Sequence, residues 1–283
     1  MRADAKLTLA LRITGLLPGG YHALDALVVA VDAPADRLTL EIGGSGAAAA
    51  VTARVHGPAA AGVPADPTNL AVRAALELLP DGAGARLDLE KHIPAGAGLG
   101  GGSSDAAAVL RALRDRLDLD PARVAAVAAM LGADVPVCVR GGVNRMEGRG
   151  EIVTPIPGGP PLDLVVAVPP FGCSTPAVYR AWDELGGPTA TRTVAAPAGW
   201  AEVWGPAWAN DLEAAAEVVA PGLAAFRDRV EAVCGGPALL AGSGSAYAAV
   251  LPDAAAAQAA AAALGSIDGV RAWAGRAPAT PES

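Results

Sequence analysis

Cysteines, aromatic residues and long apolar runs are scarce in this sequence of 283 residues. Its three cysteines, Cys138, Cys173 and Cys234, lie far apart and form no CxxC pair. This spacing argues against a disulfide framework and a zinc site, and it is typical of a protein from a reducing cytoplasm. The residues after Met1 carry charge and no apolar run, so we expect no signal peptide. No stretch of about 18 apolar residues is free of charge, Gly and Pro, so we expect no membrane span.

Basic residues are in the minority, with 21 Lys and Arg against 29 Asp and Glu, which gives a net charge of −8. The sequence has no stripe of Lys or Arg, so we expect no nucleic-acid partner, because binding to a phosphate backbone needs a basic face. Small apolar side chains are abundant, and 52% of the residues are hydrophobic. This composition predicts a packed α/β or α+β core and argues against a disordered chain.

The hydrophobic pattern predicts a mixture of strands and helices. A run of four prolines and two glycines over 155–161 predicts a linker between a domain at 1–156 and a second at 157–283. Residues 186–200 and the tail 276–283 are expected to be irregular. We expect strands at 6–14, 24–31, 36–42 and 50–55, forming an antiparallel meander, and at 86–90, 135–140, 142–146, 162–168 and 268–274, with a strand–turn–strand unit over 239–251. We expect helices at 69–79, 106–117, 121–131, 176–185, 211–219, 221–233 and 253–264.

The most informative stretch is the loop at 94–104, PAGAGLGGGSS, which leads into a predicted helix. Five of its eleven residues are glycine, which lets the backbone adopt positive φ and approach a ligand closely. A helix N-terminus adds unpaired N–H groups and the positive end of the helix dipole. Together these features predict a phosphate-binding site.

Two known nucleotide-binding motifs offer other interpretations of this glycine loop. A Walker A loop ends in Gly-Lys-Ser/Thr, whereas Gly102 is followed by Ser103, so that interpretation fails. Gly96-x-Gly98-x-x-Gly101 matches the dinucleotide-binding fingerprint, with Asp118 and Asp120 near the usual acidic position. The predicted helix is followed by a second helix where that fold requires a parallel strand, which argues against it. A glycine-rich turn that binds nothing stays open as an alternative.

The loop resembles the phosphate-binding motif of the superfamily of galactokinase, homoserine kinase, mevalonate kinase and phosphomevalonate kinase, the GHMP kinases. In its longer form, GLGGGSSDAA at 98–107, it is most similar to the family of 4-diphosphocytidyl-2-C-methyl-D-erythritol kinases. Further motifs of that family follow in the same order along most of the chain. They are AKLTL at 5–9, GYHAL at 20–24, GADVP at 132–136, GRGE at 148–151, STPAVY at 174–179, NDLE at 210–213 and GSG at 242–244.

The resemblance implies a two-domain α+β fold, with an N-terminal domain like ribosomal protein S5 and a ferredoxin-like α/β C-terminal domain. It implies a cytoplasmic kinase that uses ATP and Mg²⁺ and acts as a monomer or homodimer. The small-molecule substrate would be the cytidine diphosphate ester of methylerythritol, phosphorylated on its 2-hydroxyl in the non-mevalonate (MEP) isoprenoid pathway. Two rivals remain: another GHMP kinase with a different alcohol substrate, and a catalytically silent binder of this fold.

The resemblance also implies roles for individual residues. Asp134 would be the catalytic base and Lys6 its electrostatic partner, as phosphoryl transfer to a hydroxyl requires. Ser103 or Ser104 would bind the metal. The ATP site would comprise Pro94, Ala95, Gly96, Ala97, Gly98, Leu99, Gly100, Gly101, Gly102, Ser103 and Ser104, with Gly242, Ser243 and Gly244 on the phosphate side. The substrate site would comprise Thr8, Tyr21, His22, Lys91, Thr175 and Tyr179.

Several of these assignments have a simpler competitor, and Lys91 can be an exposed lysine without a ligand. Asp134 can serve as a turn or capping residue, Lys6 as a solvated strand residue, and the two serines as helix caps. Tyr21 and His22 can fill a turn. The family usually has Asn in place of Thr8 and Ser in place of Ala241, which leaves room for altered substrate affinity.

Overall fold

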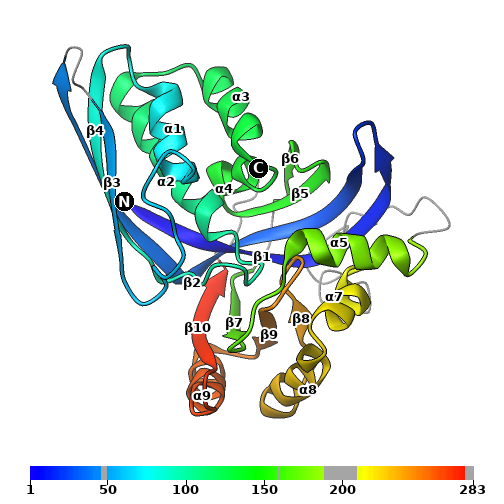
Figure 1. The fold of residues 1–283 in the computed structure, drawn as a ribbon. Coiled ribbons are helices and arrows are strands. Elements are labelled where there is room, and N and C mark those ends of the chain that lie inside the picture. The colour runs from blue at the N-terminus through cyan, green and yellow to red at the C-terminus, as the bar shows by residue number, and fades with distance from the viewer. Residues whose placement is uncertain (46–49, 158–159, 188–208, 278–283) are drawn as a thin grey trace.

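The computed structural model describes residues 1–45, 50–157, 160–187 and 209–277, which form two sheets with helices packed against them (Figure 1). Five strands of the first sheet follow the order β3-β4-β2-β5-β6, and its sixth strand, β1, also pairs with β2. All of its pairings are antiparallel except β3 with β4. Its strands are β1 (Arg2–Leu17), β2 (Tyr21–Ser45), β3 (Val51–His56), β4 (Ala83–Glu90), β5 (Val143–Gly148) and β6 (Ile152–Pro155).

The second sheet is antiparallel throughout, in the order β10-β7-β9-β8. Its strands are β7 (Leu162–Val168), β8 (Leu239–Leu240), β9 (Tyr247–Leu251) and β10 (Arg271–Ala277). Helices α8 (Gly222–Cys234) and α9 (Ala254–Gly265) pack against it, and α5 (Thr175–Glu184) and α7 (Glu213–Val219) pack against each other (Figure 1). The α+β class is confirmed. Within the described residues no helix is long and apolar enough to cross a membrane.

Four helices cover the first sheet: three of them contact its strands, and the third along the chain packs on the other three helices. They are α1 (Leu70–Leu78), α2 (Gly101–Leu117), α3 (Pro121–Leu131) and α4 (Val135–Arg140). The side chains of Asn69 and Asp120 accept hydrogen bonds from the backbone N–H groups of Ala71 and Ala122, so both residues are N-caps. The predicted bounds of α3 are confirmed.

The structure corrects the expectation that residues 135–140 form a strand, because they form α4. The valine-rich segment suggested β structure, yet Pro136 lies in the first helical turn, where its missing N–H costs nothing. In a strand the same proline would remove a ladder hydrogen bond. Helix α4 also buries Val135 and Val137, so tertiary packing offsets the low helix propensity of valine.

Three further boundaries differ from expectation. Helix α2 begins at Gly101 and not at Ala106, so the end of the glycine loop forms its first turn. The strands expected at 24–31 and 36–42 are one continuous strand, β2. The meander is incomplete, because β3 pairs in parallel with β4. The loop expected at 186–200 and the tail at 276–283 lie largely outside the described residues.

The two sheets share their hydrophobic cores. Strand β7 is buried on both faces, which explains its nearly continuous apolar run, LDLVVAV. Leu164 and Val166 pack in one cluster with Leu7 and Val29 of the first sheet. Val165 lies on the opposite face, in a cluster that includes side chains of α8 and α9. The last strand of the first sheet ends at Pro155, and the first strand of the second sheet begins at Leu162. The predicted domain boundary at 156/157 stays a prediction.

Gly275 of β10 tests this packing, because a Cβ there would lie 2.8 Å from the carbonyl oxygen of Ala33 and 2.9 Å from Val31 Cγ1. Gly275→Val should lower the free energy of unfolding by about 1–3 kcal/mol, the usual cost of overpacking. The matched control is Gly43→Val in β2, where a Cβ meets nothing within 4 Å. Urea unfolding compares the two variants, and equal midpoints would contradict the close packing of β10 on β2.

Candidate active site

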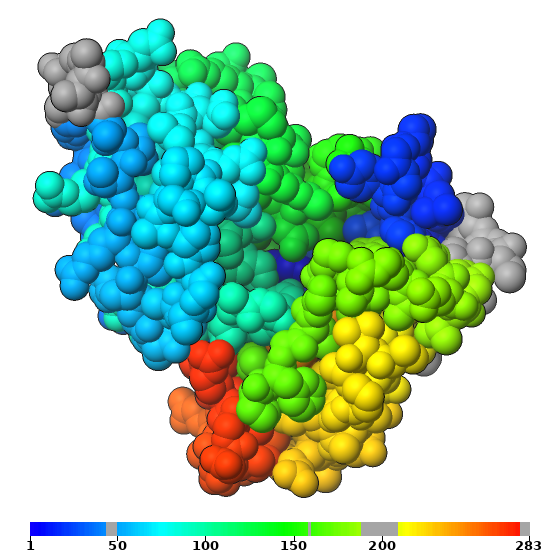
Figure 2. Space-filling model, in the orientation of Figure 1, coloured from blue at the N-terminus to red at the C-terminus, as the bar shows by residue number. Residues whose placement is uncertain are grey.

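A cleft of about 790 Å³ runs along the junction of the two sheets. Figure 2 shows this face hollowed between the cyan and green segments on one side and the yellow-green segment on the other, with dark-blue β1 at the bottom. Every residue of the predicted loop from Pro94 to Ser103 lines the cleft. So do the predicted residues Lys6, Thr8, Tyr21, His22, Lys91, Asp134, Thr175, Tyr179, Gly242 and Ser243. The cleft therefore brings together motifs that are scattered along the sequence.

The glycine loop is shaped for close backbone approach. Gly96, Gly98 and Gly100 have φ of +70°, +77° and +69°, which L side chains rarely adopt. A Cβ on Gly98 would lie 1.8 Å from the carbonyl oxygen of Ala241, so the loop backbone packs directly on a second loop. Gly100 is the N-cap of α2, and the first-turn N–H groups at this end have no partner within the helix. N–H groups of this kind can bind an anion, and this end of the helix lines the cleft.

The second loop, residues 241–246, is held by side chains from two other segments. The Asn210 amide donates to the carbonyl oxygen of Gly242 at 2.6 Å, and the hydroxyls of Thr175 and Ser243 lie 2.8 Å apart. The backbone N–H of Ala246 donates to the carbonyl oxygen of Ala97 at 3.1 Å, which ties the two loops together. Gly242 and Ser243 line the cleft, whereas the carbonyl oxygen of Gly244 faces Gly98.

Lys6 and Asp134 form an ion pair within the cleft. Lys6 Nζ lies 3.3 Å from Asp134 Oδ2 and 3.4 Å from Thr8 Oγ1. The Lys6 side chain is 9% exposed and that of Asp134 is 30% exposed. The pair is therefore mostly buried, but a ligand in the cleft can contact it. Asp134 occupies the N-cap position of α4, yet its carboxylate makes no capping hydrogen bond. The carboxylate therefore remains available to a ligand, which the alternative capping role would have prevented.

The Lys6 side chain runs between the two glycine loops. A Cβ on Gly100 would lie 2.7 Å from Lys6 Cγ, and one on Gly242 would lie 3.3 Å from Lys6 Nζ. The backbone N–H of Lys6 donates to the carbonyl oxygen of Leu99 at 3.0 Å. Both glycines thus leave the room that the lysine needs, and the glycine loop helps to fix the position of the ammonium.

Aromatic side chains from the β1–β2 hairpin and α5 line another part of the cleft. Tyr21 is exposed and begins β2. His22 Nε2 lies 2.8 Å from Asp183 Oδ1, and its ring is 4.8 Å from the ring of Tyr179 and 5.3 Å from that of Trp182. Burial and, to a lesser degree, the negative charge of Asp134 raise the pKa of Tyr179 to about 12, so its hydroxyl stays protonated.

Arg149 is a cleft residue that the sequence analysis did not assign, although it lies within the GRGE motif. Its guanidinium carbon lies 3.5 Å from the centre of the Tyr21 ring. The turn that carries it packs against Ala133, because a Cβ on Gly150 would lie 2.4 Å from the Ala133 carbonyl oxygen. Lys6 and Lys91, the two lysines of the cleft, are ion-paired, whereas Arg149 forms no salt bridge with any described residue.

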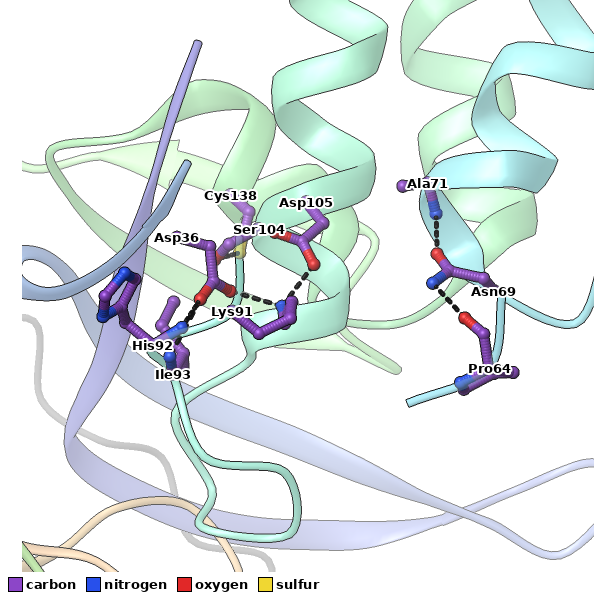
Figure 3. Close-up of polar contacts among 10 residues, drawn as sticks. All are labelled: Asp36, Pro64, Asn69, Ala71, Lys91, His92, Ile93, Ser104, Asp105 and Cys138. Carbon is purple, nitrogen blue, oxygen red and sulfur yellow. Dashed lines mark hydrogen bonds and ion pairs between the residues drawn. The ribbon is translucent and has the colours of Figure 1, made fainter. Parts of the chain in front are cut away.

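The two serines and Lys91 differ in how they face the cleft. Ser103 lines it, whereas the Ser104 hydroxyl is buried and donates to Cys138 Sγ at 3.5 Å. Burial raises the pKa of the Cys138 thiol to about 12, so it stays neutral. The Lys91 ammonium is bonded to two buried carboxylates, those of Asp36 and Asp105 (Figure 3). Binding of substrate by Lys91 stays a prediction, and any such contact would compete with these bonds.

The cleft can hold a divalent cation only if substrate phosphates and water supply part of its ligands. No group of three or more His, Cys, Asp or Glu side chains in the described chain is arranged to hold a metal ion. Mg²⁺ in phosphoryl-transfer sites is bound by one or two protein oxygens together with substrate phosphates and water. The Ser103 hydroxyl and the Asp134 carboxylate, which both line the cleft, suit that mode.

Comparisons with known proteins agree with this geometry. The family of GHMP kinases N terminal domains matches residues 69–142. The fold is similar to homoserine kinase from Cytophaga hutchinsonii, with a TM-score of 0.69 and 18% identity over 99% of this chain and 95% of that one. These likenesses show that the chain has the fold of the GHMP kinases.

Relatives of higher sequence identity show to which family within this class the chain belongs. A 4-diphosphocytidyl-2-C-methyl-D-erythritol kinase from Cereibacter sphaeroides is 41% identical, and the match covers 93% of each chain. A crystal structure of 4-(cytidine 5'-diphospho)-2C-methyl-D-erythritol kinase has a TM-score of 0.78 and 37% identity, over 98% of each chain. The chain belongs to the family of 4-diphosphocytidyl-2-C-methyl-D-erythritol kinases.

Gly100 provides a test of how Lys6 is positioned. Gly100→Ala should lower kcat/KM by roughly 10²-fold, because it displaces the lysine, and misplacement by about 1 Å can cost that much. The control is Gly235→Ala at the end of α8, which has the same φ of +69° but no atom within 4 Å of the added Cβ. Both variants should lose stability because of the shared positive φ, the first somewhat more because of its contact with Lys6, and only the first should lose activity. Equal activity in the two variants would contradict the proposed packing of Lys6.

Proposed function

We propose that this protein transfers the γ-phosphoryl group of ATP to the 2-hydroxyl of 4-diphosphocytidyl-2-C-methyl-D-erythritol, a step of the non-mevalonate isoprenoid pathway. The observation that carries the proposal is a single cleft lined by an anion-binding helix end, a Lys–Asp pair and an aromatic pocket. The names of relatives that are about 40% identical over most of the chain support the choice of substrate. The three free thiols support a reducing, cytoplasmic location.

The proposed chemistry uses the Lys6–Asp134 pair. The Asp134 carboxylate takes the proton of the acceptor hydroxyl as its oxygen attacks the γ-phosphorus. The bond from the γ-phosphorus to the bridging oxygen breaks, and ADP leaves with that oxygen. The Lys6 ammonium stabilises the negative charge that develops on the transferring group. The first-turn N–H groups of α2 bind the ATP phosphates. Mg²⁺, when bound, neutralises phosphate charge, with the Ser103 hydroxyl as the candidate protein ligand. A catalytically silent binder is not favoured, because both catalytic residues are present and paired.

The cytidine end of the substrate suits the aromatic part of the cleft. The exposed face of Tyr21 offers a stacking surface, and His22 lies beside Tyr179. A diphosphate carries negative charge, and Arg149 offers a guanidinium close to Tyr21 without a carboxylate partner among the described residues. Homoserine and mevalonate carry neither a base nor a diphosphate. Relatives that act on them are less than 20% identical to this chain and share only its fold.

A turnover assay tests the function directly. The protein, ATP and Mg²⁺ should phosphorylate the cytidine diphosphate ester and leave homoserine and mevalonate unchanged. Asp134→Asn keeps the size of the side chain and removes the base, so kcat should fall by roughly 10²–10⁴-fold while ATP binding changes little. Near-full activity in this variant would show that Asp134 is not the base. Turnover of mevalonate or homoserine in preference to the ester would overturn the substrate assignment.

Tyr21 tests how the base is recognised. Stacking on one base contributes about 1–3 kcal/mol, so Tyr21→Ala should raise KM for the cytidine substrate by roughly 5- to 150-fold. The control is Tyr21→Phe, which keeps the ring face and should stay near the original value. KM for ATP should change in neither variant. If Tyr21→Ala instead raises KM for ATP and leaves KM for the acceptor unchanged, Tyr21 lines the adenine side of the cleft. The assignment of cytidine to Tyr21 then fails.

A further inference from the structure

The carboxylate of Asp183 contacts the aromatic part of the cleft from behind, without lining the cleft itself. It lies near the end of α5, which runs beside the β1–β2 hairpin (Figure 1). Among the described residues, its side chain pairs with that of His22, whose Nε2 lies 2.8 Å from Asp183 Oδ1. The two residues are 161 positions apart, and the STPAVY motif ends before Asp183. No sequence signal therefore pointed to this contact.

Three side chains of α5 hold the imidazole ring of His22. The Tyr179 ring lies 4.8 Å away, and the Trp182 ring meets the imidazole edge-on at 5.3 Å. Trp182 is itself part of a hydrophobic core, which fixes the helix against the rest of the molecule. Tyr179 and Asp183 are four residues apart, so they lie on the same face of α5. The ring is 11% exposed and has little freedom to turn.

The contact with Asp183 decides which nitrogen of the ring carries the proton. An ionised carboxylate accepts hydrogen bonds and cannot donate them, so Nε2 of His22 must be the donor. In a neutral imidazole the other nitrogen, Nδ1, then has a lone pair and can only accept. His22 lines the cleft, and its Nδ1 has no hydrogen-bond partner among the described residues. A ligand in this part of the cleft therefore meets Nδ1 as an acceptor.

An acceptor in this place distinguishes cytosine from uracil. The amino group of cytosine donates hydrogen bonds, whereas uracil carries an accepting carbonyl oxygen at the same ring position. Nδ1 of His22 can accept a hydrogen bond from the amino group. Against the carbonyl oxygen it would place one lone pair beside another, and a repulsive contact of this kind is an effective way to reject a wrong ligand.

We propose that Asp183 is a positioning residue that sets base specificity. By holding the proton of His22 on Nε2, it keeps Nδ1 as an acceptor for the amino group of cytosine and so excludes uracil. This inference rests on the proposed function, because it concerns the base of the same acceptor. Asp183 acts on the binding of that base, so its loss should change KM for the acceptor and leave kcat and KM for ATP nearly unchanged.

The test compares the cytidine ester with its uridine analogue in steady-state assays with Mg²⁺ and ATP at pH 8, which favours the neutral imidazole. Asp183→Asn keeps the size of the side chain, but its amide can donate as well as accept, so His22 can carry its proton on either nitrogen. The ratio of kcat/KM for cytidine over uridine should fall by roughly 5- to 10-fold, the usual effect of one hydrogen bond. An unchanged ratio would overturn the proposal, even if both activities fall together.

The matched control is Glu184→Gln, which removes the same charge from the next residue of α5, also exposed. It should keep the wild-type ratio. An equal fall of the ratio in both variants would mean that the charge of the helix end is responsible, and it would overturn a specific role for Asp183.

Nitrogen-15 NMR without substrate separates this proposal from the proposed function. The chain has three histidines, and His22→Gln identifies the signals of His22 by their loss. At pH 8 the wild-type ring should carry its proton on Nε2, and Asp183→Asn should show a population with the proton on Nδ1. A wild-type ring with its proton on Nδ1 overturns the proposal, whatever the enzyme phosphorylates. If the proton is on Nε2 but neither ester is phosphorylated, the proposed function fails and takes base selection with it, while the contact between His22 and Asp183 stands.

Discussion

The contact on which the site depends is the close packing of two glycine loops around one lysine. The backbone of Gly98 lies against the Ala241 carbonyl so closely that any side chain there would collide with it. The Lys6 side chain occupies the space that Gly100 and Gly242 leave open. This arrangement joins the first sheet, the start of α2 and the second sheet at one point. The position of the ammonium, the N–H groups at the start of α2 and the cleft itself all follow from it.

Local sequence predicted most of the elements and the chemistry of the loop, because glycine runs, N-caps and alternating patterns act over a few residues. It could not show that Lys6 and Asp134 meet, since 128 positions separate them, and only the family resemblance suggested their pairing. The strand predicted at 135–140 was wrong because a short valine-rich run fits a strand and a helix equally well. Pro136 was the signal that favoured a helix start.

Charged residues were the hardest to place from sequence. Lys91 precedes a phosphate loop, which makes a substrate contact a natural expectation, yet its ammonium is bonded to two buried carboxylates. One partner, Asp36, lies 55 positions away, and no local pattern reveals such a bond. Arg149 shows the opposite case. Its motif was recognised, but only the folded chain shows that its guanidinium lies over Tyr21 and forms no salt bridge with described residues.

The continuity of β2 has a consequence for selectivity. This strand carries Tyr21 at its first position and Asp36 well along its length, and it is hydrogen-bonded to β1, β4 and β5. Its pairing with β1 is irregular between Val31 and Ala35, but the pairing with β5 before this point and with β4 after it holds the strand in place. The strand therefore keeps the span between Tyr21 and Asp36 nearly constant. On the proposed function, the enzyme therefore selects acceptors by their length. A molecule anchored at Tyr21 must reach Asp134, and a shorter alcohol has no anchor to hold its hydroxyl there.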